Sequence, residues 1–194
     1  MALKRPKWKP GTLVVLEHES KILKGNALGD PHVRRLAVWL PPAYDDVGPK
    51  AWGRRFPVLY DMVGFMGSGL AHVGWKGFGE NVPERVARLI HEERMGPAIM
   101  VFPDCFTALG GNQYVNSSAI GNYADYLTKE IVPLVDREFR TLPSRDHRGC
   151  LASPRAATAP SSTACATRER GARSPTTRAI PTSSSCTGTT GRTR

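Results

Sequence analysis

A glycine-rich loop directly after the most apolar stretch of the chain is the first place where the sequence could do chemistry. The apolar stretch is Pro57–Val63, and Gly64-Phe65-Met66-Gly67-Ser68-Gly69 follows it. Three glycines in six residues indicate a backbone in unusual conformations or close to a ligand. Phosphate binding is one interpretation, but the fingerprints Gly-x-Gly-x-x-Gly and Gly-Lys-Ser/Thr are both absent here. Nucleotide binding is therefore disfavoured, and contact with another ligand stays possible.

A second group of polar residues lies in the long connection from Pro103 to Gly121. A connection of this length inside a compact domain is usually functional. The side chains that could line a substrate pocket are Asp104, Asn112, Gln113, Tyr114, Asn116 and Ser117. A packed surface loop with polar side chains is an equally good interpretation, and the sequence does not decide between the two.

Alternating strands and helices are expected to position these loops. The predicted strands cover Thr12–Leu16, Arg35–Leu40, Pro57–Val63 and Ala98–Phe102. The last two are nearly continuous apolar runs, which is typical of strands covered on both faces. Between them, Asn81 is expected to cap a helix that has Pro83 in its first turn. Strand, helix and strand in this order predict a right-handed parallel crossover.

A further helix is predicted from Asn122 to about Phe139, and Pro133 inside it is expected to produce a kink. After a turn, the run Arg145–Gly149 has the character of a lead-in to another buried strand. The strand itself is expected to be missing, because from Cys150 onward large apolar side chains almost disappear.

Taken in order, several of these segments resemble one family. They are the strand ended by Pro41-Pro42, the strand that runs into the glycine loop, and the segments Ala98–Asp104, Gly110–Ser117 and Gly121–Thr141. The set is similar to the esterase family of α/β-hydrolases that includes esterase D, enterochelin esterase and mycolyltransferases. The resemblance covers about residues 30–149. It implies an α/β fold of the hydrolase type, a mostly parallel sheet with flanking helices, truncated in this chain.

The resemblance also implies a chemistry, the hydrolysis of a small-molecule carboxylic ester by a serine nucleophile. In this family the serine lies on a sharp Gly-x-Ser-x-Gly turn, a histidine takes its proton, and an acid orients the histidine. Two backbone amides stabilise the oxyanion of the tetrahedral intermediate. By resemblance, one of them would here be the amide of Phe65 or of Met66. The resemblance implies no cofactor and no metal.

The sequence departs from the family where the nucleophile is expected, a few residues after Gly149. The segment Leu151-Ala152-Ser153-Pro154-Arg155 is not Gly-x-Ser-x-Gly, and Pro154 has no amide to donate to an oxyanion. His147 is the last histidine and precedes the expected nucleophile. The other histidines, expected to be structural or on the surface, are His18, His32, His72 and His91. No catalytic residue is assigned, and the chain as written is predicted to be inactive.

The tail, residues 150–194, has the composition of a disordered segment. It contains no aromatic residue and no Val, and Ala, Ser, Thr and Arg fill 32 of its 45 positions. So little apolar surface cannot offset the backbone entropy of folding. We hypothesise that the tail is a gene read in the wrong frame, because shifted codons from Leu151 to Pro160 permit Gly-Lys-Ser-Ser-Gly-Gly-Tyr-Gly-Ala. We therefore expect the chain to divide into two segments: residues 1–149, the N-terminal part of an esterase domain, and the tail, residues 150–194.

Charge and hydropathy bear on partners and location. The net charge is +10, of which the tail carries +6 through seven Arg and one Glu. A non-catalytic pseudo-hydrolase, or a binding protein whose Arg-rich tail contacts nucleic acid, is the alternative function. Nucleic acid is disfavoured because the tail has no aromatic side chain to stack on bases. No run is long enough to span a membrane, and Leu13–Leu16 is too short for a secretion signal, so a cytoplasmic location is expected.

Overall fold

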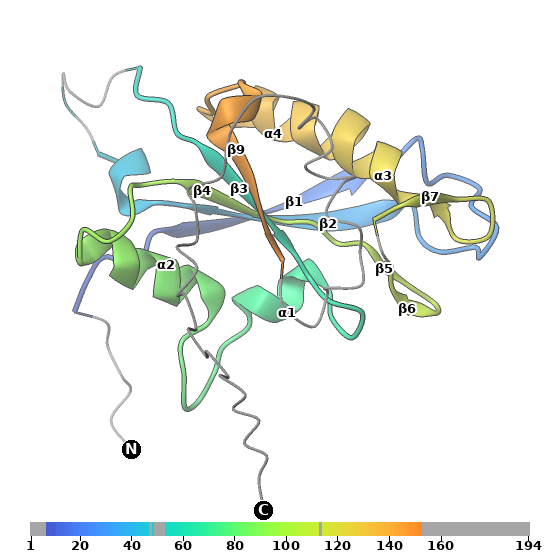
Figure 1. The fold of residues 1–194 in the computed structure, drawn as a ribbon, viewed down its shortest axis with the longest axis horizontal. Coiled ribbons are helices and arrows are strands. Elements are labelled where there is room, and N and C mark those ends of the chain that lie inside the picture. Colours follow the sequence, from blue (N-terminus) through green and yellow to red (C-terminus); the bar gives the residue numbers. More distant parts are fainter. Residues whose placement is uncertain (1–6, 47, 49–52, 113, 153–194) are drawn as a thin grey trace, which may run out of the picture.

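The structure is a computed structural model, and it describes residues 7–46, 48, 53–112 and 114–152. At its centre is a five-stranded sheet in the order β1-β2-β4-β3-β9 (Figure 1). The strands are β1 (Thr12–Glu19), β2 (Val33–Leu40), β3 (Val58–Met62), β4 (Ile99–Phe102) and β9 (Arg148–Ala152). Strand β3 runs parallel to both of its neighbours, whereas β1 and β2 are antiparallel additions at the other side. The predicted parallel crossover between β3 and β4 is confirmed.

Helices cover both faces of the sheet (Figure 1). On one face lie α1 (Gly69–Val73) and α2 (Val82–His91), and on the other lies one long helix made of α3 (Tyr123–Asp125), the π-helical segment η2 (Tyr126–Ile131) and α4 (Val132–Glu138). Two short 3-10 helices are η1 (Pro42–Tyr44) and η3 (Arg145–His147). Two small hairpins pair β5 (Phe106–Thr107) with β6 (Gly110–Gly111) and β7 (Asn116–Ser117) with β8 (Gly121–Asn122).

Helix α2 begins where its capping residues predict. The Asn81 side chain accepts a hydrogen bond from the Glu84 amide at 2.8 Å, and the Glu84 carboxylate accepts one from the Asn81 amide at 3.0 Å. Two amides that the helix itself leaves without partners are therefore satisfied. Pro83 and Val86 are buried on the inner face. This fixes the connection from β3 to β4.

The long helix is distorted at its proline, as expected. Because Pro133 has no amide hydrogen, the regular bond to the carbonyl of Lys129 cannot form. The turn before it widens to a π-helix, in which the Val132 amide donates to the Leu127 carbonyl. At the start of this helix the prediction is wrong in one detail. Asn122 occupies the cap position but makes no capping hydrogen bond.

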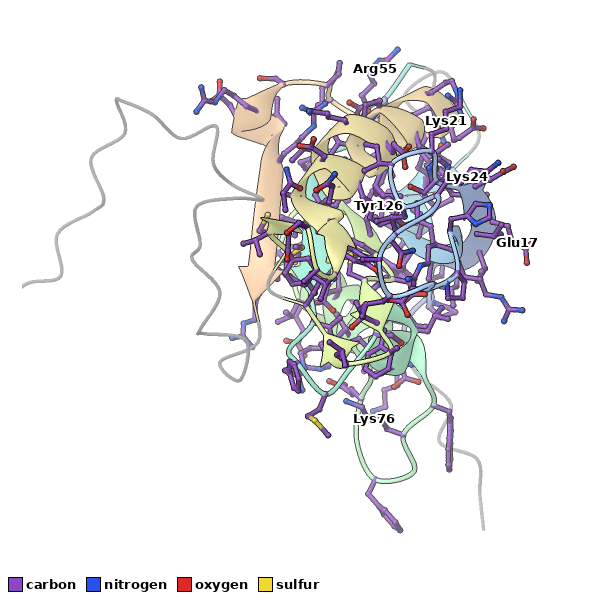
Figure 2. All side chains as sticks on the ribbon, turned by 90° about the vertical axis from the view of Figure 1, so that its right-hand side faces the viewer. Glu17, Lys21, Lys24, Arg55, Lys76 and Tyr126 are labelled. Carbon is purple, nitrogen blue, oxygen red and sulfur yellow. The ribbon has the colours of Figure 1, made fainter. Side chains whose placement is uncertain are left out.

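Strand β9 is present, and the prediction from composition that no strand forms here is wrong. It runs from Arg148 to Ala152 and pairs in parallel with all five residues of β3. Backbone hydrogen bonding to a neighbouring strand does not need large side chains. At Gly149 the absence of a side chain also leaves room for Leu59, because a Cβ there would lie 2.7 Å from Cδ2 of Leu59. Figure 2 shows β9 at the edge of the sheet. The rest of the tail, residues 153–194, lies outside the described residues.

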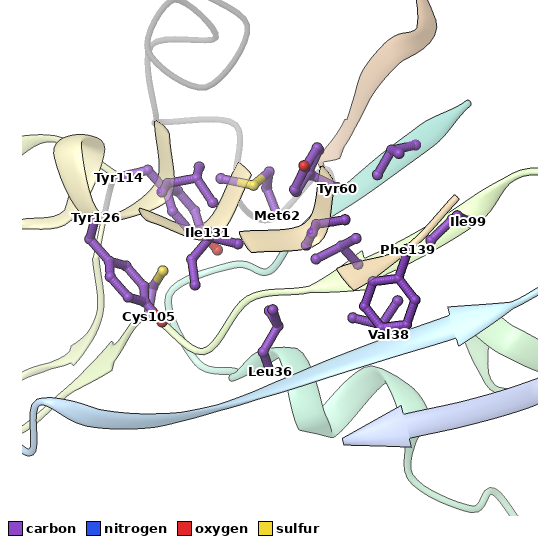
Figure 3. Close-up of a cluster of buried hydrophobic side chains, with 14 of the residues drawn as sticks. Leu36, Val38, Tyr60, Met62, Ile99, Cys105, Tyr114, Tyr126, Ile131 and Phe139 are labelled. Atoms are coloured by element: carbon purple, nitrogen blue, oxygen red, sulfur yellow. The ribbon is translucent and has the colours of Figure 1, made fainter. Parts of the chain in front are cut away.

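Two hydrophobic cores hold the layers together. The smaller one packs Trp39, Met100 and Phe102 against Val86 and Ala87 of α2. The larger one lies between the sheet and the long helix, and Figure 3 labels ten of its buried side chains: Leu36, Val38, Tyr60, Met62, Ile99, Cys105, Tyr114, Tyr126, Ile131 and Phe139. Among the described residues, no helix has the length and the apolar character to cross a membrane.

Candidate active site

The glycine loop, Gly64–Gly69, connects the end of β3 to the start of α1. A turn within it is closed by a hydrogen bond from the Gly67 amide to the Gly64 carbonyl, 3.0 Å long. The residues Phe65 and Met66 are 57% and 89% exposed. In the described part of the chain, neither the Phe65 amide nor the Met66 amide donates to a protein acceptor. Neither amide is therefore committed to an acceptor among the described residues, and the oxyanion role of Phe65 and Met66 stays a prediction.

Close backbone contacts fix the position of this loop from two sides. The Gly111 amide of the β5–β6 hairpin donates to the Phe65 carbonyl at 2.7 Å. A Cβ at Gly111 would lie 2.8 Å from that oxygen, so only glycine allows the hairpin to approach. A Cβ at Gly69 would lie 2.5 Å from the Phe102 carbonyl oxygen at the end of β4. Substitution at either glycine would push the loop out of place.

Tyr114 supports the same loop from inside the protein. Its hydroxyl donates to the Val63 carbonyl at 2.8 Å, and its amide donates to the Asn112 side chain at 2.7 Å. The Asn112 amide group in turn donates to the Cys105 carbonyl at 2.6 Å. Burial raises the pKa of the Tyr114 phenol, so the hydroxyl keeps its proton and remains a donor. Tyr114 has a φ of 55°, a left-handed conformation that these contacts must hold in place.

The structure separates the predicted pocket residues into groups. Asn112 and Tyr114 are brought to the glycine loop, as described above. Asp104 instead lies 3.6 Å from the buried Arg34, and Asn116 accepts a hydrogen bond from the Asp125 amide at 3.1 Å. Gln113 lies outside the described residues. The contacts of Asp104 and Asn116 are internal to the fold, and contact of any of these residues with substrate stays a prediction.

The end of β9 lies beside the end of β3. Asp61 pairs with Leu151 and Met62 pairs with Ala152, so both strands finish at the same edge of the sheet, where the glycine loop begins. The carboxyl ends of parallel strands are where ligands bind in open α/β sheets. Ser153, the first residue beyond β9, lies outside the described residues.

No family's sequence profile and no curated protein matches the chain. Solved structures do match. One is a ferulic acid esterase, with a TM-score of 0.57, 21% identity, and coverage of 73% of this chain and 50% of the other. Another is a CE1 ferulic acid esterase from the anaerobic fungus Anaeromyces mucronatus, with a TM-score of 0.55, 19% identity, and coverage of 80% and 54%. A third is an S-formylglutathione hydrolase from Agrobacterium tumefaciens, with a TM-score of 0.53, 19% identity, and coverage of 76% and 50%.

The chain has an α/β-hydrolase fold. It spans about half the length of the structures it matches. The order of strands and helices, the mostly parallel centre of the sheet and the flanking helices are those that the sequence resemblance implies.

A buried arginine that the sequence analysis did not single out organises one edge of this hydrolase fold. Arg34 of β2 donates to the Phe106 carbonyl at 2.6 Å and to the Tyr123 hydroxyl at 2.9 Å. Burial raises the pKa of Tyr123 to about 12, although the nearby guanidinium opposes the shift. Arg34 therefore ties the long connection after β4 to the start of the helix that covers the sheet.

A carboxylate–histidine pair lies next to the glycine loop. Nδ1 of His72 in α1 is hydrogen-bonded to Oδ2 of Asp61 in β3. The sequence contained a signal for it, since Asp61 is the one charged residue in the apolar stretch Pro57–Val63. A charge in a strand covered on both faces needs a partner or a function. In the described part of the hydrolase fold, no group of three or more side chains could hold a metal ion.

Three other histidines make contacts that fit the structural or surface role expected of them. His18 lies 3.2 Å from Glu130 of the long helix, and His32 lies 3.5 Å from Glu19. The His91 ring stacks on Trp8 with 6.2 Å between the ring centroids.

Proposed function

We propose that this chain carries the N-terminal half of a carboxylic ester hydrolase. The observation that supports this function is that the amides of Phe65 and Met66 donate to no acceptor among the described residues. They lie at the carboxyl end of the central parallel strand, in a loop held by close contacts on both sides. Acyl transfer from an ester passes through a tetrahedral intermediate whose oxygen carries a negative charge. Fixed amide donors in a loop of this kind stabilise that charge without needing to rearrange.

Placement of β9 supports the same function. In an α/β-hydrolase the serine nucleophile lies on the turn after a strand whose end is close to the oxyanion loop. Strand β9 ends beside β3, and the position after it is occupied by Ser153 and Pro154. Ser153 lacks the flanking glycines of the nucleophile turn, and Pro154 lacks the amide that would complete the oxyanion hole. The serine route is therefore inactive in the chain as written.

The substrate proposed is a small-molecule ester. Solved structures with this fold include enzymes named for ferulic acid esters and for S-formylglutathione. Both an aromatic ester such as methyl ferulate and a simple activated ester such as p-nitrophenyl acetate are suitable probes, because the described residues do not define an acyl pocket.

Two proteins are compared in the experiment: this chain, and a chain whose residues from 150 onward are those of the shifted reading frame. We expect the shifted chain to hydrolyse an ester and to be labelled covalently by a fluorophosphonate, a reagent for activated serines. Ala in place of the serine of its Gly-x-Ser-x-Gly turn is the matched control and should abolish both signals. The chain as written should not be labelled. A folded shifted-frame protein that is neither labelled nor active on esters would refute the proposal.

A further inference from the structure

Asp61 is in a position where a carboxylate destabilises the fold unless something compensates for it. Its side chain is 7% exposed, and the flanking residues of β3, Tyr60 and Met62, are buried in the larger core. In the described residues, His72 provides the one hydrogen bond to this carboxylate. Burial of a charge with a single partner is unfavourable compared with an apolar residue at the same place. A contribution to stability therefore does not explain the pair, which makes it a candidate for a functional role.

The bond to Asp61 determines which nitrogen of His72 carries the proton. A carboxylate oxygen can only accept, so in the neutral imidazole the hydrogen lies on Nδ1 and Nε2 carries the lone pair. No described residue bonds to Nε2, and 26% of the His72 side chain is exposed, so water can reach the ring. An imidazole held in this tautomer by a buried carboxylate is the arrangement of a general base.

The pair also lies at the base of the glycine loop. Asp61 precedes Gly64 by three residues, and His72 follows Gly69 by three residues in the last turn of the short helix α1. Their contact joins the two ends of the loop that carries the amides of Phe65 and Met66. A base and a pair of oxyanion donors are thus supplied by one continuous segment of the chain.

We propose that Asp61 and His72 form a dyad that activates water for the hydrolysis of activated acyl esters, without a serine. The proposal rests on the oxyanion role given above to the Phe65 and Met66 amides. Nε2 of His72 takes a proton from water as the water oxygen bonds to the ester carbonyl carbon. The carbonyl oxygen becomes an oxyanion held by the two amides. When the intermediate collapses, the C–O bond to the alcohol breaks, and the leaving oxygen takes the proton back from Nε2. The products are the acid and the alcohol, and His72 is regenerated.

In this mechanism His72 is the catalytic base and Asp61 is a positioning residue. The sequence predicts that the chain as written is inactive, because it lacks the serine and its base. The dyad revises that prediction, since it gives a slow route that a fluorophosphonate does not block. General-base catalysis contributes roughly 100- to 10,000-fold to a rate. The predicted activity is therefore weak compared with that of an intact serine esterase and well above that of free imidazole at the same concentration.

The experiment measures hydrolysis of p-nitrophenyl acetate by the full chain after fluorophosphonate treatment. We expect a rate above the buffer background that falls roughly 100-fold or more in His72→Ala and is partly restored by added imidazole. His72→Gln can still donate to Asp61, so it should keep the melting temperature and lose the rate. Asp61→Asn should lose most of the rate, because an amide oxygen no longer stabilises the imidazolium. The matched control, His32→Gln, removes a histidine that directly precedes β2 and lies near Glu19 of β1, and it should leave the rate unchanged.

Two results would overturn the dyad. One is a treated wild-type chain that is no faster than buffer containing imidazole. The other is a folded His72→Gln protein that retains the wild-type rate. Neither result touches the proposed esterase function, since that function is tested by fluorophosphonate labelling of the shifted-frame chain. Conversely, an unlabelled shifted-frame chain together with a His72-dependent rate would reject the serine route and keep the dyad.

Discussion

The support that Tyr114 gives to the glycine loop can be measured because the chain contains matched controls. The Tyr114 hydroxyl donates to the Val63 carbonyl at 2.8 Å. Two other buried tyrosines, Tyr60 and Tyr126, have hydroxyls without a hydrogen-bond partner among the described residues. Phenylalanine in place of each tyrosine removes one oxygen and leaves the aromatic ring and its packing unchanged. The three variants therefore differ in whether a hydrogen bond is lost.

The expected magnitudes follow from what each substitution leaves behind. In Tyr114→Phe the Val63 carbonyl loses this donor at a residue that is 6% exposed, and a buried group left unsatisfied costs about 1–3 kcal/mol. In Tyr126→Phe no hydrogen bond is lost, and an unpaired buried hydroxyl is itself unfavourable by about 1–3 kcal/mol. We expect Tyr114→Phe to lower the free energy of unfolding and Tyr126→Phe to leave it unchanged or raise it.

Urea denaturation followed by tryptophan fluorescence gives the free energy of unfolding of each protein, and thermal melting gives a second measure. A loss of 1 kcal/mol corresponds to about 2–4 °C in melting temperature for a domain of this size. Amide chemical shifts add a readout at the site, where only Tyr114→Phe should move the signal of Phe65. Equal free energies of unfolding for Tyr114→Phe and Tyr126→Phe would refute the role given to the Tyr114 hydroxyl.

Three further predictions concern stability. Gly69→Ala should destabilise the fold by about 1–3 kcal/mol, because the new methyl group meets the Phe102 carbonyl, whereas Gly79→Ala has open space and should be neutral; urea denaturation compares the two. Asn81→Ala removes the cap of α2 and should cost about 0.5–2 kcal/mol in the same assay. Burial raises the pKa of Glu130, but hydrogen bonds from neighbouring side chains and backbone amides outweigh it and lower the pKa. A lowered pKa in the folded state stabilises the protein above the unfolded value and loses this effect as the pH falls through the folded value. The stability advantage of wild type over Glu130→Gln should therefore shrink between about pH 5 and pH 3, and an advantage that grows on acidification would contradict the assigned contacts.

Local sequence signals predicted the elements that depend on local chemistry. The cap at Asn81, the apolar run of β3 and the distortion at Pro133 each follow from residues within one turn or one strand of the feature. The glycine loop was also found from its composition, because close backbone approach at Gly69 requires the absence of a Cβ. Such features are predictable since the responsible atoms are neighbours in the sequence.

Features that depend on distant contacts were missed. Arg34 and Phe106 are 72 residues apart, and no local pattern marks Arg34 as a buried residue that organises the connection after β4. The prediction from composition is wrong at β9, where the shortage of large apolar side chains indicated that no strand would form. The strand forms because β3 offers it a full row of backbone partners, and Gly149 and Cys150 fit against its side chains. Backbone pairing with the edge that β3 offers was enough to form the strand despite the low content of apolar side chains in β9.

Among the described residues, the contacts named above that position the glycine loop come from residues before β9. The Val63 carbonyl is held by Tyr114, the Phe65 carbonyl by Gly111, and the far end of the loop by Asp61 through His72. Strand β9 adds backbone bonds to β3 but makes none of these contacts. The oxyanion donors and the dyad should therefore keep their arrangement whichever sequence follows Gly149. This is why the shifted-frame chain and the chain as written can be compared directly: they differ in the nucleophile and share the loop that would stabilise the charge.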